Sequence, residues 1–189
     1  MKVYSKSWLG LKFKNFHKIS NKELPGKKFY DDFYDLCFDK YKKIENFPEN
    51  WLLEKKIDSI DLNNVITKYG CNKVLSLASG LGVIEHNLIK INPELEIFCN
   101  DLSKNISWAF DNSSRVKHIN LDDYYEFDFD IIFINGLDYA LKDQEYISFL
   151  ELVSELKTKI IMLSCVVFPE DLSLKNKIGH ILKGLFGWQ

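Results

Sequence analysis

The chain has 189 residues, 46% of them hydrophobic and 14% aromatic, which predicts one globular domain and excludes an intrinsically disordered protein. No apolar run is long enough to cross a membrane, and residues 1–16 lack the apolar core of a signal peptide, so we expect a cytoplasmic location. The net charge is −2, but residues 1–28 carry eight lysines and one acid, a net +7, which leaves −9 for the other residues.

The lysines of this basic leader alternate with aromatic residues, among them Trp8 and Phe13. One hypothesis is a lid that orders over the functional site when an anionic acceptor binds. The alternative is a solvated segment whose aromatic side chains pack on the domain. Arg115 is the only arginine, and nucleic-acid readers favour arginine forks, so we expect no sequence-specific nucleic-acid binding.

Helical spacing of apolar residues follows over 29–44 and over 51–69, where Gly70 is a suitable C-terminal cap. Beyond residue 70 the pattern alternates between strand and helix. The expected strands are 73–78, 95–100, 115–121, 129–135 and 159–167, and the expected helices are 82–91, 103–111, 141–156 and 171–186. Alternation with apolar strands predicts an α/β fold, a Rossmann-like three-layer αβα sandwich with a mostly parallel sheet.

We therefore expect two regions within one structural unit. Residues 1–69 form a basic leader and a helical cap, and residues 70–189 form a Rossmann-like cofactor-binding domain. The four cysteines are Cys37, Cys71, Cys99 and Cys165. Their spacing indicates neither a metal site nor a disulfide framework, so we expect buried free thiols.

The run from Val74 to Gly82 is the most informative stretch of the chain. Apolar strand residues lead into Ala78, Ser79, Gly80 and Gly82, and a helix begins directly afterwards. Such a turn brings backbone N–H groups close to a ligand. Asp101 ends the next strand, where an acid binds the ribose hydroxyls of an adenosine cofactor in folds of this kind. The structural alternative for Asp101 is an N-terminal cap of the next helix.

Glu85 stands where dinucleotide-binding turns have a third small residue, and its carboxylate would repel a pyrophosphate. The pattern of residues 74–82 with this acid resembles the first motif of the class I S-adenosylmethionine-dependent methyltransferases. The resemblance covers about residues 70–168. It departs from the family at Ser76, where an acid is frequent, and at Ala78, where a first glycine is frequent.

The resemblance implies that S-adenosylmethionine is the cofactor, with S-adenosylhomocysteine as its product. The implied cofactor-binding residues are Ala78, Ser79, Gly80, Gly82, Asp101, Leu102, Asp122, Asn135, Tyr30 and Tyr34. Leu102 would cover the adenine, and Asp122 would accept a hydrogen bond from its amino group. Asn135 stands at the end of its strand, at the position that faces the transferred methyl group in the family. Solvated turn acids at 122–123 and an amphipathic cap helix around Tyr30 are the structural alternatives.

Methyl transfer needs alignment of the acceptor and, for an oxygen or neutral nitrogen, removal of one proton. Asp138 is the best-placed base and His118 the next, although a lone histidine is more often structural. No Pro-Pro-aromatic sequence follows residue 135, which argues against a nucleobase acceptor. We expect methyl transfer to an oxygen or nitrogen of a small molecule, such as a carbohydrate or an anionic metabolite.

Two other interpretations stay open. Ser76 and Ala78 also fit a non-catalytic or truncated member of this fold that acts as a binding or partner subunit, and a nicotinamide-dependent oxidoreductase is disfavoured by Glu85. The family's sheet ends with an antiparallel hairpin after the last helix, so its C-terminal strands are expected to be missing here. The strand at 159–167 would then be an exposed edge, available for a homo-oligomer.

Overall fold

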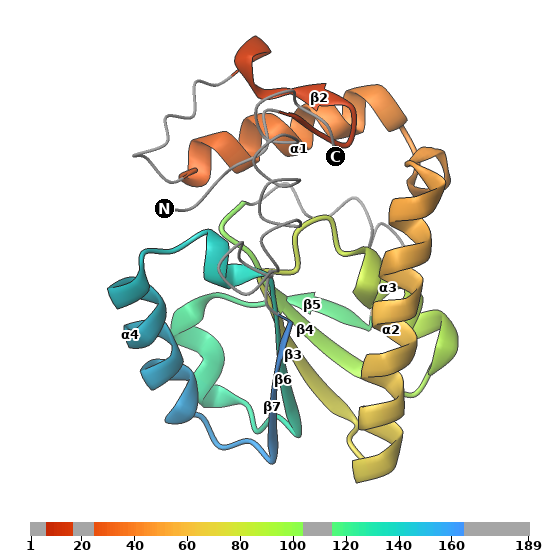
Figure 1. Cartoon of the computed structure of the whole chain (residues 1–189). Helices are drawn as coiled ribbons and strands as arrows, with labels where there is room; N and C mark the ends of the chain where they lie inside the picture. Colours follow the sequence, from red (N-terminus) through yellow and green to blue (C-terminus); the bar gives the residue numbers. More distant parts are fainter. Residues whose placement is uncertain (1–6, 17–24, 104–114, 165–189) are drawn as a thin grey trace, which may run out of the picture.

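The computed structural model describes residues 7–16, 25–103 and 115–164 (Figure 1). Their centre is a parallel five-stranded sheet in the order β5-β4-β3-β6-β7. The strands are β3 (Lys73–Leu77), β4 (Glu96–Asn100), β5 (Val116–His118), β6 (Ile131–Asn135) and β7 (Ile160–Ser164). β3 lies in the middle, parallel to both β4 and β6.

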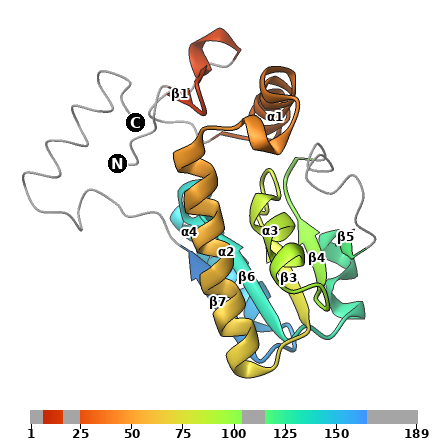
Figure 2. The same ribbon diagram turned by 90° about the vertical axis from the view of Figure 1, so that its right-hand side faces the viewer.

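Both faces of the sheet are buried, as the continuous apolar strand sequences predict. Val74 and Ile131 point into one core cluster, whereas Leu75 and Ile132, the next residues of the same strands, point into another. Helices α2 (Glu49–Tyr69) and α3 (Val83–Ile91) cover the first face (Figure 2). Helix α4 (Asp143–Ser154) and the 3-10 helix η4 (Leu121–Glu126) cover the second. The predicted Rossmann-like αβα sandwich is confirmed.

Helix α2 ends where the sequence indicates. Gly70 adopts a left-handed conformation with φ of +61°, and its N–H donates to the carbonyl of Thr67. Leu62 and Ile66 of this helix are fully buried against the sheet, so α2 is one of the layers of the sandwich.

Asp130, directly before β6, ties together the amino ends of three strands. Its Oδ2 accepts hydrogen bonds from the backbone N–H groups of Asn72 and Lys73, at 2.9 and 3.0 Å. Its Oδ1 accepts one from Nζ of Lys159, at 2.7 Å. The lysine and the two N–H groups lower the pKa of this carboxyl to about 2.

Helix α1 (Lys27–Tyr41) lies above the carboxyl ends of the strands (Figure 1), and its buried residues belong to a third, aromatic core cluster. Strands β1 (Ser7–Trp8) and β2 (Leu11–Lys12) form an antiparallel hairpin, followed by the 3-10 helix η1 (Phe13–Asn15). The hairpin was not predicted. Trp8 of the hairpin and Phe13 of η1 pack against Phe33 of α1. For these residues the structure shows the packing that the second interpretation of the leader expects.

Other differences are local. Strand β5 is shorter than the predicted 115–121, and the 3-10 helix η4 follows it in the connection to β6. Cys37, Cys71 and Cys99 are buried free thiols. The predicted helices 103–111 and 171–186, Cys165 and the end of strand 159–167 fall largely outside the described residues. Within the described part of the chain, β5 and β7 are the two outer strands of the sheet. No helix among the described residues is long and apolar enough to cross a membrane.

Candidate functional site

The turn between β3 and α3 has an unusual backbone. Ala78, Gly80 and Gly82 all have positive φ, at +57°, +59° and +68°. The N–H of Gly82 donates to the carbonyl of Ser79 at 2.9 Å, and the N–H of Ser79 donates to the carbonyl of Asn100 at 3.3 Å. This tightly bonded turn therefore lies between the carboxyl ends of β3 and β4, as the sequence predicts.

Asp101 follows β4 and accepts two backbone hydrogen bonds, from Gly80 to Oδ2 at 2.8 Å and from Ser103 to Oδ1 at 2.9 Å. The hydroxyl of Ser103 donates to Oδ1 of Asp31 in α1, at 2.6 Å. Burial raises the pKa of the Asp101 carboxyl and so does the charge of Asp31, while both N–H groups lower it. The bond to Ser103 is the contact that the structural alternative expects, although the helix that it would cap lies outside the described residues. Each carboxylate oxygen has a further lone pair for a ligand hydroxyl.

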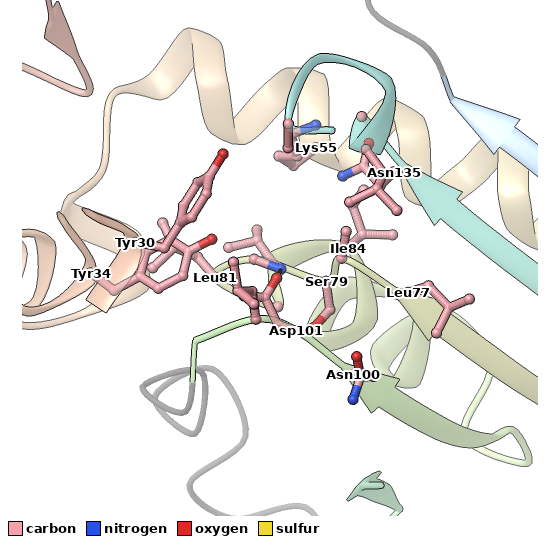
Figure 3. A pocket seen from close by; sticks show the side chains of 18 of the residues that line it. Tyr30, Tyr34, Lys55, Leu77, Ser79, Leu81, Ile84, Asn100, Asp101 and Asn135 are labelled. Atoms are coloured by element: carbon pink, nitrogen blue, oxygen red, sulfur yellow. Dashed lines mark hydrogen bonds between the residues drawn. The ribbon is translucent and has the colours of Figure 1, made fainter. Parts of the chain in front are cut away.

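A cavity of about 490 Å³ opens above the turn, in the size range of small-molecule sites (Figure 3). Nine of the ten predicted cofactor-binding residues line it: Tyr30, Tyr34, Ala78, Ser79, Gly80, Gly82, Asp101, Leu102 and Asn135. They come from α1 and from the carboxyl ends of three neighbouring strands. The side chain of the tenth, Asp122, lies outside the described part of the structure.

The two predicted catalytic residues are not in the lining. Asp138 is buried in the 3-10 helix η5 (Leu137–Tyr139), whereas Leu137 and Ala140 on either side of it do line the cavity. His118 is exposed at the end of β5, next to β4 rather than at the centre of the sheet. Asp138 is therefore the nearer of the two in the fold, and both roles stay predictions.

Residues that the sequence interpretation missed form the outer wall. Trp51, Glu54 and Lys55 come from the first turns of α2, and Trp8 comes from the hairpin. A signal for two of them exists in the sequence. Trp51 and Lys55 precede Ser59, Leu62 and Ile66 at helical spacing, and the last three are buried, so the same helix face continues beyond the sheet to the cavity.

Glu85 of α3 is fully buried next to the turn. The hydroxyl of Ser76 donates a hydrogen bond to its Oε1, whereas its Oε2 has no hydrogen-bond partner among the described residues. Burial raises the pKa of this carboxyl to about 7, although the bond from Ser76 lowers it. An acid is thus present beside Ser76, on the helix rather than at the family's position on the strand.

The comparisons with solved structures give the fold. The methyltransferase domain of bacterial CtHen1-CN superposes with a TM-score of 0.51 at 14% identity, over 72% of this chain and 86% of that one. The plantazolicin methyltransferase BpumL, solved with a monoazolic desmethylPZN analog and S-adenosylhomocysteine, superposes with a TM-score of 0.50 at 14% identity, over 86% of this chain and 58% of its own. This chain has a class I methyltransferase-like fold. No protein-family model and no curated protein matches the sequence.

The methyltransferase-like fold explains where the cavity lies. From β3 the chain passes to β4 and β5 on one side of the sheet, then crosses to β6 and β7 on the other. Ligands of open α/β sheets bind at such a switch point, beyond the carboxyl ends of the strands. The turn at residues 78–82 follows the strand at the switch point. Among the described residues, no group of His, Cys, Asp or Glu side chains is arranged to hold a metal ion.

Proposed function

We propose that this protein binds S-adenosylmethionine and transfers its methyl group to an oxygen or nitrogen of a small molecule. The observation that carries the proposal is the cavity at the switch point, lined by both the glycine-containing turn and the Asp101 carboxylate. The turn, with no phosphate to bind, tolerates the buried acid Glu85 beside it.

In this proposal different residues bind the cofactor, exclude water and remove a proton from the acceptor. When bound, S-adenosylmethionine supplies a methyl group on an already activated sulfonium. Asp101 accepts hydrogen bonds from the ribose hydroxyls, the backbone of residues 78–82 borders the methionine part, and Leu102 covers one face of the adenine. The rings of Tyr30 and Tyr34 close the cavity from α1 and exclude water. Asp138, in η5 between the lining residues Leu137 and Ala140, is the proposed base for acceptors that must lose a proton, and its carboxyl would have to turn into the cavity to act.

Isothermal titration calorimetry with S-adenosylhomocysteine tests the proposal, and NADH serves as the matched adenosine-containing comparison. We expect saturable binding of S-adenosylhomocysteine and none of NADH at the same concentrations. Binding of NADH alone would support the oxidoreductase interpretation and contradict the proposal.

A binding or partner subunit without methyl transfer is the second candidate, and the observation behind it is the methyl group of Ala78 at a position of positive φ. Mass spectrometry separates the two. The protein is incubated with S-adenosylmethionine and a mixture of alcohols, phenols and amines, and a product heavier by one methylene group supports the enzyme. Binding of S-adenosylhomocysteine without any such product supports the second candidate.

A further inference from the structure

Trp8 presents a fixed indole ring to the cavity. It stacks on Phe33 with ring centroids 5.0 Å apart and an interplanar angle of 6°, so one face of the indole is covered. The hairpin that carries it is bonded to α1, because the hydroxyl of Tyr41 donates to the carbonyl of Leu9 at 2.6 Å and Nζ of Lys40 donates to that of Gly10 at 3.1 Å. The half-buried ring also lines the cavity, so its remaining surface is held ready for a ligand.

Trp51 is a second half-buried indole in the lining, contributed by α2. Its ring centroid lies 5.2 Å from that of Phe47, and the Phe47 ring stacks on Tyr41 at 4.2 Å. Tyr41 therefore supports both tryptophans, one through its hydroxyl and the hairpin, the other through its ring. Walls supported in this way lose little conformational entropy when a flat molecule packs on them.

The charges of the described lining are mostly negative. Its charged residues are Glu54, Lys55 and Asp101. Nζ of Lys55 is paired with Oδ2 of Asp58 at 2.8 Å, which neutralises its charge. The exposed Glu54 carboxylate has no hydrogen bond or ion pair within the described residues. An anionic group between the two tryptophans would be repelled by the Glu54 carboxylate, which no cation among the described residues offsets.

We propose that the methyl acceptor is a flat aromatic compound, uncharged or carrying an amine, that packs on Trp8 and Trp51 with Glu54 at the edge of its subsite. The inference rests on the proposed function, which assigns the Asp101 end of the cavity to the cofactor. Aromatic rings stack on indoles, and an ammonium group gains both from their faces and from a nearby carboxylate. This acceptor replaces the anionic one expected from the lysines of residues 1–28.

Three probes with the same ring test the charge preference: 2-naphthylmethylamine, 2-naphthylmethanol and 2-naphthoate. Each is titrated into protein saturated with S-adenosylhomocysteine and followed by ligand-observed NMR. We expect the amine and the alcohol to bind at least about tenfold more tightly than the carboxylate. Trp8→Ala should weaken the amine and the alcohol about tenfold, while Trp8→Phe keeps most of the affinity.

Two charge variants of α2 distinguish a local effect of Glu54 on the ligand from an effect of the protein's overall charge. Glu54→Gln should reduce the preference for the amine over the carboxylate, whereas Asp61→Asn, which removes one exposed charge outside the lining of the same helix, should leave it unchanged. Neither position is buried, so folding is not at risk. The affinity for S-adenosylhomocysteine should stay within about twofold in all these variants.

Several results would overturn the inference. Equal or tighter binding of 2-naphthoate would do so, as would binding of S-adenosylhomocysteine with no binding of any probe. Unchanged probe affinity in a folded Trp8→Ala protein and in Trp51→Ala would exclude the tryptophan walls. Failure of S-adenosylhomocysteine itself to bind is a distinct result, because it would overturn the proposed function first and the inference with it.

Discussion

The backbone N–H of Gly80 donates a 2.8 Å hydrogen bond to Oδ2 of Asp101, which joins the turn after β3 to the tip of β4. The other oxygen of the same carboxylate binds the N–H of Ser103. The side chain proposed to bind the cofactor's ribose therefore also fixes the turn along which the cofactor would lie. A substitution at residue 101 acts on both.

Replacing Asp101 with alanine is expected to weaken the binding of S-adenosylhomocysteine by about 1–3 kcal/mol, because the ribose hydroxyls and two half-buried N–H groups lose their acceptor. Calorimetry measures the affinity and thermal unfolding measures the stability. Asp128→Ala is the control, because Asp128 is exposed and precedes β6. It therefore lies near the amino ends of the strands, whereas the cavity lies at their carboxyl ends. An unchanged dissociation constant in a folded Asp101→Ala protein would exclude the ribose role.

Replacing Ala78 with glycine is expected to stabilise the protein by about 1 kcal/mol, since a φ of +57° strains any residue that has a Cβ. The matched control is Ala140→Gly, at a φ of −88°, which should destabilise by about 0.5–1 kcal/mol. Urea unfolding measures both. Destabilisation by the first substitution would show that the turn is not strained.

Gly80→Ala should lower both stability and the affinity for S-adenosylhomocysteine. A Cβ there would lie 3.3 Å from the hydroxyl of Tyr34, and φ is +59°. Gly70→Ala isolates the backbone effect, because its φ is +61° but nothing lies within 4 Å of its Cβ. We expect about 1 kcal/mol of destabilisation and no loss of affinity at Gly70.

A double-mutant cycle of Gly80→Ala with Tyr34→Phe measures how much of the lost stability comes from the close contact between the new Cβ and the Tyr34 hydroxyl. Because the phenylalanine lacks the crowded hydroxyl, the double variant should be more stable than the sum of the single effects by about 0.5 kcal/mol. Strict additivity would show that the tyrosine does not limit the space at residue 80.

We expect the free energy of unfolding to depend on pH because of the buried Glu85 carboxyl. Burial raises its pKa from 4.5 to about 7 in the folded protein. Between these pH values the folded state holds a proton that the unfolded state has lost. The free energy of unfolding should therefore fall by about 3 kcal/mol as pH rises from about 4.5 to about 7, and this contribution is constant above that.

Glu85→Gln tests this assignment. The amide oxygen can still accept the Ser76 hydrogen bond but the residue does not titrate, so the slope should flatten between these pH values and the variant should be more stable than the parent at pH 8. Glu94→Gln, at an exposed position, is the control and should keep the slope. A parent-like slope in Glu85→Gln would assign the titration to another group.

The sheet and the turn could be predicted because their signals are local. The apolar strands at β3, β4 and β6 are continuous, Gly80 and Gly82 mark the turn, and Asp101 ends β4 at the expected interval. These features alone place most of the cofactor side of the cavity.

The outer wall could not be predicted in this way. The two strands of the hairpin have two residues each and no alternating pattern, and Trp8 reaches the cavity only through the packing of the hairpin on α1. Asp138 follows β6 as expected, yet within η5 it is buried and is not among the residues that line the cavity. Contacts between distant segments and short 3-10 turns decide these positions.

The hydrogen bonds that Asp130 accepts from the start of β3 join segments that the ribosome makes at different times. The hydrogen bond from Lys73 to Asp130 spans 57 residues, so the central strand β3 can pair with β4 long before β6 exists. At about 5–20 residues per second, the ribosome needs roughly 3–11 seconds to make the intervening segment. Throughout that interval the edge of the nascent β3 that later pairs with β6 is unpaired, beside the apolar side chains of Leu75 and Leu77. Association between nascent chains is therefore most favoured before residue 131 has been added.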